Sequence, residues 1–222
     1  MKSSLLARSL RVARKDWSVE RRSLAGLAST GLFALVTLAA ISMALGPFAA
    51  GSDVLASLLW IVLFFAGFAG LAQGFAREFD AHTASHLKLL AGAHEVLIGK
   101  FLMNLWLLAL VELFAVPLFL VLMEPKVARP GVFLATLALA DLGFAAASTL
   151  LAAIVGQARS RGALFAGISL PILIPLLLAA IGGTKVAFGA GSEASPHLLT
   201  LASFDAVLMG VSMLLIEPVW NE

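Results

Sequence analysis

Residues 24–45, LAGLASTGLFALVTLAAISMAL, and residues 54–76, VLASLLWIVLFFAGFAGLAQGFA, decide the fold of this chain. Neither stretch contains a charged residue. A helix needs about 20 apolar residues to cross about 30 Å of hydrocarbon, and both stretches meet that length. Two such segments predict an integral membrane protein built from helices.

The rest of the chain supports this class. Four further apolar segments follow: residues 101–123, 131–158, 163–183 and 198–216. Of the 222 residues 61% are hydrophobic and 13% are charged, whereas a soluble domain carries about 25% charge. We therefore predict an all-α membrane protein with six transmembrane helices between residues 24 and 216, and a short tail at 217–222.

Basic residues in the connecting segments predict the orientation. Twelve lie in the amino-terminal arm and after the second and fourth spans: Lys2, Arg8, Arg11, Arg14, Lys15, Arg21, Arg22, Arg77, Lys88, Lys100, Arg159 and Arg161. Three lie in the opposite segments: Lys126, Arg129 and Lys185. Because cytoplasmic loops carry the excess of Lys and Arg, both termini are expected in the cytoplasm. Topology thus explains the basic isoelectric point of about 9.3 without a nucleic acid partner.

The arm itself, residues 1–23, has the pattern of an amphipathic helix. One predicted face carries Leu6, Leu10, Ala13 and Trp17, and the other side carries Arg8, Arg11, Lys15 and Arg22. This pattern predicts a helix that lies in the cytoplasmic interface of the bilayer, held partly by anionic lipid. The alternative is a basic tail that only sets the topology.

The sequence lacks the residues that several kinds of catalytic and binding site require. The chain has no cysteine, which excludes disulfides, thiolate metal sites and C-x-x-C-H haem attachment. The nearest approach to a phosphate-binding loop, Gly92 to Phe101, has the wrong glycine spacing and no hydroxyl residue after Lys100. His82 and His86 have a metal-binding spacing but no evident third ligand. We predict no catalytic residue, no metal site and no cofactor held by this chain itself.

Three acidic residues interrupt the apolar segments: Glu112, Asp141 and Asp205. Ionisable side chains inside a bilayer cost about 2.5–3.5 kcal/mol on insertion scales and usually mark a functional site. With no Lys, Arg or His inside the spans, they are either protonated or hydrogen-bonded to Asn104, Gln73 or backbone carbonyls. The three acids either form a functional site or make polar contacts that hold helices together. In both cases we expect them to face inward.

Two other features bear on movement. Pro171 and Pro175 lie at i and i+4 in the fifth span, where missing backbone donors predict a kink, either static or beside a moving gate. The cytoplasmic loop at 77–100 reads REFDAHTASHLKLLAGAHEVLIGK. It predicts a short amphipathic helix that docks on a soluble partner or rests on the bilayer.

This loop carries a family resemblance. The segment GFAREFDAHTASHLKLLAGAHEVLIGKFLMNLW at 74–106 resembles ABC-2-type permeases and, more closely, the haem exporter protein B family of cytochrome c maturation. The matching patterns are F-x-R-E, L-L-A and G-K-F-L-x-N-L. The segment RGALFAGISLPILIPLLLAA at 161–180 resembles the fifth span of that family. Ser85 and His86 depart from a usual acidic residue, and Gly92 from a usual proline.

The resemblance implies a non-enzymatic permease subunit in a bacterial inner membrane. An ATP-binding cassette partner would hydrolyse ATP and dock on residues 77–91. Further cytochrome c maturation membrane subunits and a periplasmic haem chaperone are also implied. Haem would be transported or handed over, with its ligation mainly on a partner. The expected ATPase-coupling contact comprises Arg77, Glu78, Asp80, Leu87, Leu90 and Lys100.

Two alternatives remain open from the residues. An ABC-2 permease for a lipid, glycan or drug would have the same fold, and genomic adjacency to cytochrome c maturation genes would separate it. An ion-coupled secondary transporter would use the three buried acids, need no ATPase and respond to a proton gradient. An intramembrane enzyme is disfavoured because no nucleophile–base pair is visible.

Overall fold

The computed structural model describes residues 5–20, 25–45, 50–71, 91–155 and 161–221. Within these ranges the chain forms seven helices and no strand: α1 (Leu5–Glu20), α2 (Ala25–Leu45), α3 (Ser52–Leu71), α6 (Ala93–Met123), α7 (Pro130–Val155), α8 (Arg161–Ala187) and α9 (Ser195–Asn221). The prediction of an all-helical chain is confirmed for this part of the sequence.

Five of these helices are long and apolar enough to cross a membrane, namely α2, α6, α7, α8 and α9. The helix α3 contributes a shorter apolar stretch at Ser52–Gly67. Residues 72–76, which we predicted as the end of the second span, lie outside the described residues. Large apolar side chains such as Met43, Leu113 and Leu214 are exposed on the outside, as a surface that faces lipid requires.

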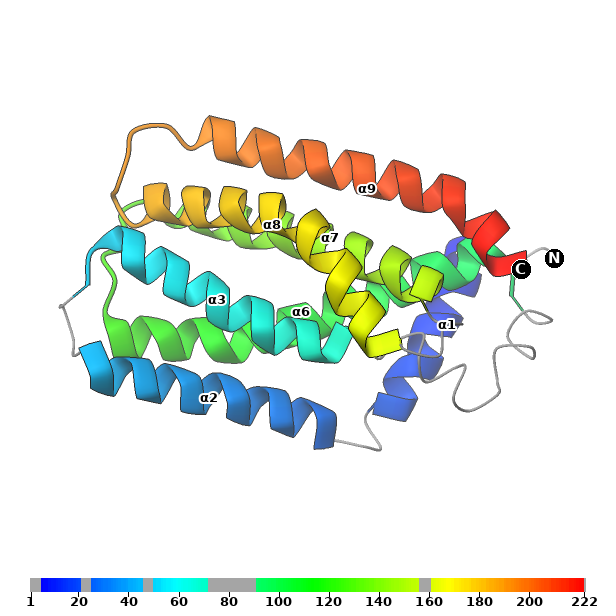
Figure 1. Ribbon diagram of the computed structural model, residues 1–222, viewed down its shortest axis with the longest axis horizontal. Helices are drawn as coiled ribbons and strands as arrows, with labels where there is room; N and C mark the ends of the chain where they lie inside the picture. The colour runs from blue at the N-terminus through cyan, green and yellow to red at the C-terminus, as the bar shows by residue number, and fades with distance from the viewer. Residues whose placement is uncertain (1–4, 21–24, 46–49, 72–90, 156–160, 222) are drawn as a thin grey trace.

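The long helices lie side by side, and α1 lies across one end of them (Figure 1). Both chain termini are found at that end, which we call the terminal end (Figure 1). The end of α2, the start of α3 and the α6–α7 and α8–α9 connections lie at the other end, which we call the distal end (Figure 1). The most buried span is α7, which packs against α6, α8 and α9.

Two clusters of apolar side chains hold the helices together. The larger cluster follows the bundle and contains the fully buried Trp60, Phe119 and Leu176. The indole N–H of Trp60 donates a 2.7 Å hydrogen bond to the Thr184 hydroxyl, so this buried polar pair joins α3 to α8. The smaller cluster lies on α6, α7, α8 and α9 and includes Phe165 and Trp220.

Two helices extend past the apolar runs that predicted them. Whereas the third apolar run starts at residue 101, α6 begins at Ala93, because Gly92 and Glu95 cap its amino terminus. Likewise α9 continues to Asn221, through most of the predicted tail at 217–222. Its last turn is held by Trp220, which is 6% exposed in the smaller apolar cluster.

The helix α8 changes direction along its length (Figure 1). Pro171 and Pro175 lie inside it, as the sequence places them. Each proline removes one backbone donor and crowds the preceding turn, which is the usual cause of a bend within a helix. The half of α8 that follows the prolines runs along the bundle to the distal end (Figure 1).

Candidate functional site

A buried ion pair joins α1 to the first turns of α6 at the terminal end. The ammonium of Lys100 lies 2.8 Å from the Asp16 carboxylate, and the two side chains are 3% and 13% exposed. Burying a charge is unfavourable unless a partner compensates it, so the two groups depend on each other. Lys100 therefore faces α1 and not the surface of the protein.

A second ion pair lies beside the first. Arg8 of α1 contacts Glu95 of α6 at 3.0 Å, with the Glu95 side chain 9% exposed. The same carboxylate accepts a 3.3 Å hydrogen bond from the Gly92 backbone N–H, which caps the start of α6. Glu95 thus fixes both the beginning of α6 and its contact with α1.

Close packing at Gly99 completes this contact. A Cβ atom at position 99 would lie 2.7 Å from Val12 Cβ and 2.9 Å from the Ser9 carbonyl oxygen. Trp17 of α1 meets Trp106 of α6 edge to face, with ring centroids 5.8 Å apart. We call the contact formed by Arg8, Asp16, Glu95, Gly99 and Lys100 the α1–α6 clamp.

The face that α1 turns to α6 differs from the apolar face seen in the sequence. Ser9 and Val12 are buried, whereas Leu10 is 57% exposed. The reason is the close approach at Gly99, which accepts small side chains and leaves the larger Leu10 outside. The basic residues Arg11 and Arg14 are exposed as well. The helix therefore has a packed face, an exposed apolar edge and a basic side.

Most of the predicted ATPase-coupling contact lies outside the described residues. This applies to Arg77, Glu78, Asp80, Leu87 and Leu90. Lys100 is described, and it lies in the α1–α6 clamp. The described chain resumes at Ala91, and α6 starts two residues later. The loop that was predicted to dock a partner therefore runs directly into the helix that holds α1.

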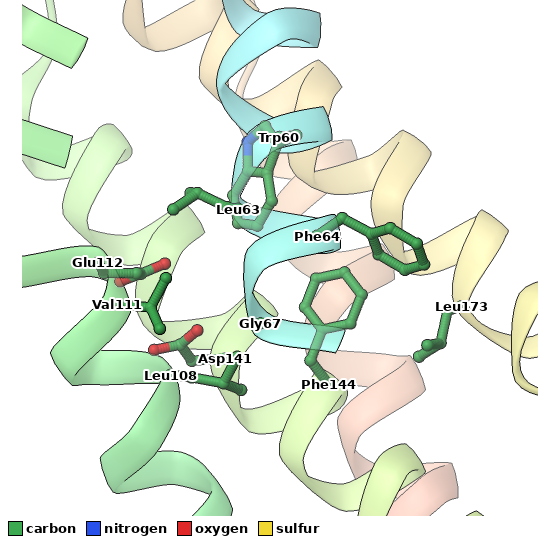
Figure 2. Close-up of a pocket in the computed structure, with 10 residues that line it drawn as sticks. All are labelled: Trp60, Leu63, Phe64, Gly67, Leu108, Val111, Glu112, Asp141, Phe144 and Leu173. Atoms are coloured by element: carbon green, nitrogen blue, oxygen red, sulfur yellow. The ribbon is translucent and has the colours of Figure 1, made fainter. Parts of the chain in front are cut away.

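Two of the three intramembrane acids lie together. Figure 2 shows the carboxyl groups of Glu112 on α6 and Asp141 on α7 pointing toward each other at one side of a pocket. The two carboxyl groups therefore face each other across the α6–α7 contact, in largely apolar surroundings. Asp141 is 7% exposed, whereas Glu112 is half-buried.

The pocket beside this pair is small. Trp60, Phe64 and Phe144 supply aromatic walls across from the carboxyl groups (Figure 2). Its cavity volume is about 20 Å³. A single water molecule needs roughly 10–15 Å³ by the same measure, so the cavity has room for about one. One Glu112 oxygen has no partner among the described residues, and such a water would satisfy it.

The other intramembrane polar residues lie elsewhere. Asn104 does not contact the acids; it donates a 2.8 Å hydrogen bond to the Thr149 hydroxyl and joins α6 to α7. Asp205 of α9 faces Gly143 of α7, where a Cβ atom would lie 2.6 Å from its carboxyl oxygen. Among the described residues neither oxygen of Asp205 has a hydrogen-bond partner. Gln73, the other suggested partner, lies outside those residues.

Sequence reasoning missed the acidic half of the α1–α6 clamp. The sequence pattern of the arm draws attention to its cations and leucines and assigns no role to Asp16 or Glu95. A signal was present, because Asp16 follows Val12 by four residues and therefore shares its helix face. What the sequence could not show was that this face lies against α6.

The arrangement at the site is mechanical in character. The described residues contain no group of three or more His, Asp or Glu side chains that could hold a metal ion. The chemistry present consists of ion pairs and hydrogen bonds that lock α6 to α1 and to α7. Such contacts can transmit displacement from one helix to the next.

Comparison with known proteins identifies the family of the chain. A family model described as CcmB protein matches residues 7–217, which is nearly the whole chain. The match covers α1 almost from its start and continues into the last turns of α9. No curated protein matches the chain significantly.

Proposed function

The chain belongs to the CcmB family, and from this premise we propose how it uses ATP that another subunit hydrolyses. The family provides the haem exporter permease subunit of the cytochrome c maturation ABC transporter. The chain is accordingly a multi-pass membrane protein and the permease, not the ATPase, of a complex that includes an ATPase partner. Its topology, its coupling route and the path of haem are the parts that we propose.

The proposed topology has six spans, with α3 as the second and both termini in the cytoplasm of a bacterium. Two observations support it. Both termini lie at the terminal end, as an even number of crossings requires (Figure 1). Among the described residues that end carries Arg8, Arg11, Arg14 and Lys15, and an excess of basic residues favours the cytoplasmic side.

In this topology α1 lies in the cytoplasmic interface of the bilayer. The exposed Leu10 would enter the lipid boundary, and the basic side of α1 would meet anionic headgroups. The α1–α6 clamp supports this placement, because it holds α1 across the terminal end of the bundle (Figure 1). The helix is then a part of the permease and more than a basic tail.

The proposed coupling route begins at the loop before α6. The ATPase partner would dock on residues 77–91, with Arg77, Glu78 and Asp80 in the polar contact and Leu87 and Leu90 as apolar anchors. We assign Lys100 to the next step, because its ammonium is buried against Asp16 and so transmits motion to α1. The helix α6 then continues for 31 residues, about 46 Å at 1.5 Å per residue, toward the distal end.

The proposed role for haem is handover at the external face and not passage through this subunit. The interior cavity of about 20 Å³ supports this, since ligand pockets typically have 300–1,000 Å³. Further membrane subunits of cytochrome c maturation and a periplasmic haem chaperone would then receive the haem.

The observation that carries the coupling route is the buried Lys100–Asp16 pair next to the docking loop. Its test is Glu78→Lys in the complete complex. We expect membrane insertion and ATP hydrolysis to persist while cytochrome c maturation falls. Glu124→Lys, the same charge reversal at an exposed distal residue, is the control and should mature cytochrome c normally. Normal maturation by Glu78→Lys would refute the docking assignment.

A further inference from the structure

A groove lies at the distal end between α8, α9 and the loop that joins them. Its cavity volume is about 540 Å³, within the range of small-molecule sites. The wall from α8 is apolar at Leu178, Ile181 and Val186, and the polar groups are Lys185, Glu193 and His197. An apolar wall beside a few polar groups is the usual composition of a ligand site.

The loop that closes this groove is held in a defined shape. Gly189 has a φ of +90°, and the Ala190 N–H donates a 2.9 Å hydrogen bond to the Lys185 carbonyl, which ends α8 in a Schellman motif. Ser52 donates to the Phe188 carbonyl at 3.0 Å, and Arg129 donates to the Ser192 carbonyl at 2.9 Å. Hydrogen bonds from the start of α3 and from the α6–α7 connection thus hold the α8–α9 loop, which forms one side of the groove.

His197 enters the groove from the first turn of α9. Its ring lies directly over Gly182 of α8, at a position where any Cβ atom would collide with it. The ring is therefore placed by packing, whereas its nitrogens make no hydrogen bond with the described residues. A positioned imidazole with an unused nitrogen is the commonest protein ligand for a metal ion.

Charged groups next to the ring can orient a ligand. Lys185 pairs with Asp53 at 3.2 Å, but the two side chains are 37% and 68% exposed, so the pair is weak and can exchange. Arg129 reaches the same loop through Ser192. Glu193 is the opposing charge in the groove, so an acidic ligand group would turn toward Lys185.

We propose that this groove is a contact site for haem, where His197 ligates the iron and Lys185 pairs with a propionate. The porphyrin face lies on Leu178, Ile181 and Val186. A lone pair of the neutral imidazole forms the iron–nitrogen bond and displaces a water molecule from the iron. This proposal rests on the proposed function, because the groove would be the surface of this subunit at which haem is handed over on the external side.

The direct test measures haem binding by the full chain with its ATPase partner in nanodiscs. Fe(III) protoporphyrin IX is titrated and its Soret band recorded, with empty nanodiscs subtracted. His197→Phe keeps a ring over Gly182 and removes the ligand, so we expect affinity to fall about tenfold or more, since losing even a residue that supports a metal ligand costs about 10–100-fold. His94→Phe is the matched control, since His94 lies at the terminal end beside Met213 and Glu217.

Two further readouts decide the outcome. Metal-free protoporphyrin IX should bind the wild type and His197→Phe with equal affinity, because the variant loses only the contact with iron. Lys185→Ala should lower the affinity for both the iron porphyrin and the metal-free porphyrin, because both carry propionates. Equal iron-porphyrin affinity and spectra for wild type and His197→Phe would overturn the site. If the wild-type chain itself fails to restore cytochrome c maturation in a strain that lacks it, the proposed function fails instead.

Discussion

The ammonium of Lys100 on α6 lies 2.8 Å from the carboxylate of Asp16 on α1, and its side chain is 3% exposed. A lysine so close to an apolar membrane span would ordinarily extend toward water. Here it turns to another helix and makes the amino-terminal arm a structural part of the bundle. The contact is therefore sensitive to any change of charge at either residue.

Asp16→Asn should strongly destabilise the permease, because it removes the carboxylate that lies 2.8 Å from the buried Lys100 ammonium. Breaking a buried ion pair by removing one partner costs about 3–5 kcal/mol. Asp53→Asn is the control, since Asp53 also pairs with a lysine but lies 68% exposed, where such pairs contribute about 0–1 kcal/mol. Unfolding by SDS in mixed micelles compares the two variants, and equal losses would contradict the burial argument.

Substitution at Gly99 should loosen α1 without touching a charge. Valine there would collide with Val12 and with the backbone of Ser9, which cannot yield as a flexible side chain can. We expect trypsin to cleave at the exposed Arg11 and Arg14 about tenfold faster, since cleavage follows local opening. Gly31→Val in α2, where no atom lies within 4 Å of an added Cβ, should leave cleavage unchanged.

The Glu112–Asp141 pair predicts non-additive effects. Asp141→Leu leaves the Glu112 carboxyl as the one acidic group among apolar pocket residues, and a buried polar group without a partner costs about 1–3 kcal/mol. Replacing both residues with leucine removes the orphaned group, so the double variant should be more stable than Asp141→Leu alone. The same SDS unfolding assay measures both variants. Losses that simply add would show that the pair does not act as a unit.

The proposed topology can be mapped with single cysteines, because the chain has none of its own. Arg14→Cys and Glu193→Cys place thiols at exposed positions on the terminal and distal ends. A membrane-impermeant maleimide added to intact spheroplasts should label Glu193→Cys and not Arg14→Cys. Permeabilised cells should label both, and the reverse pattern in intact cells would invert the orientation.

The sequence predicted those parts of the fold that depend on hydrophobic length. Residues 24–45 became α2 almost to the residue, since a bilayer demands a minimum apolar run and little else. Helix ends were harder to place. The first turns of α6 contain Glu95 and Lys100, and an argument from hydropathy places charged residues outside a span. Their charges are paired with α1, so the helix starts earlier.

The candidate site was predictable in kind and not in arrangement. Glu112 and Asp141 stood out because acids are rare in membrane spans, but their proximity depends on how α6 packs on α7. Asn104 was one of several suggested partners for the acids, and in the structure it donates to Thr149, a choice that one sequence cannot decide. The distal groove needed His197 to lie over Gly182, a contact between two helices that no local pattern encodes.

The small cavity beside Glu112 and Asp141 also has an electrical consequence. A conducting path requires a continuous file of water, and a void of about 20 Å³ holds roughly one molecule. Each elementary charge that crosses a bilayer dissipates about 2.3 kcal/mol per 100 mV. In the conformation described, a bundle packed this tightly at its centre holds no continuous file of water beside these acids, so it insulates the membrane and does not short-circuit a proton gradient.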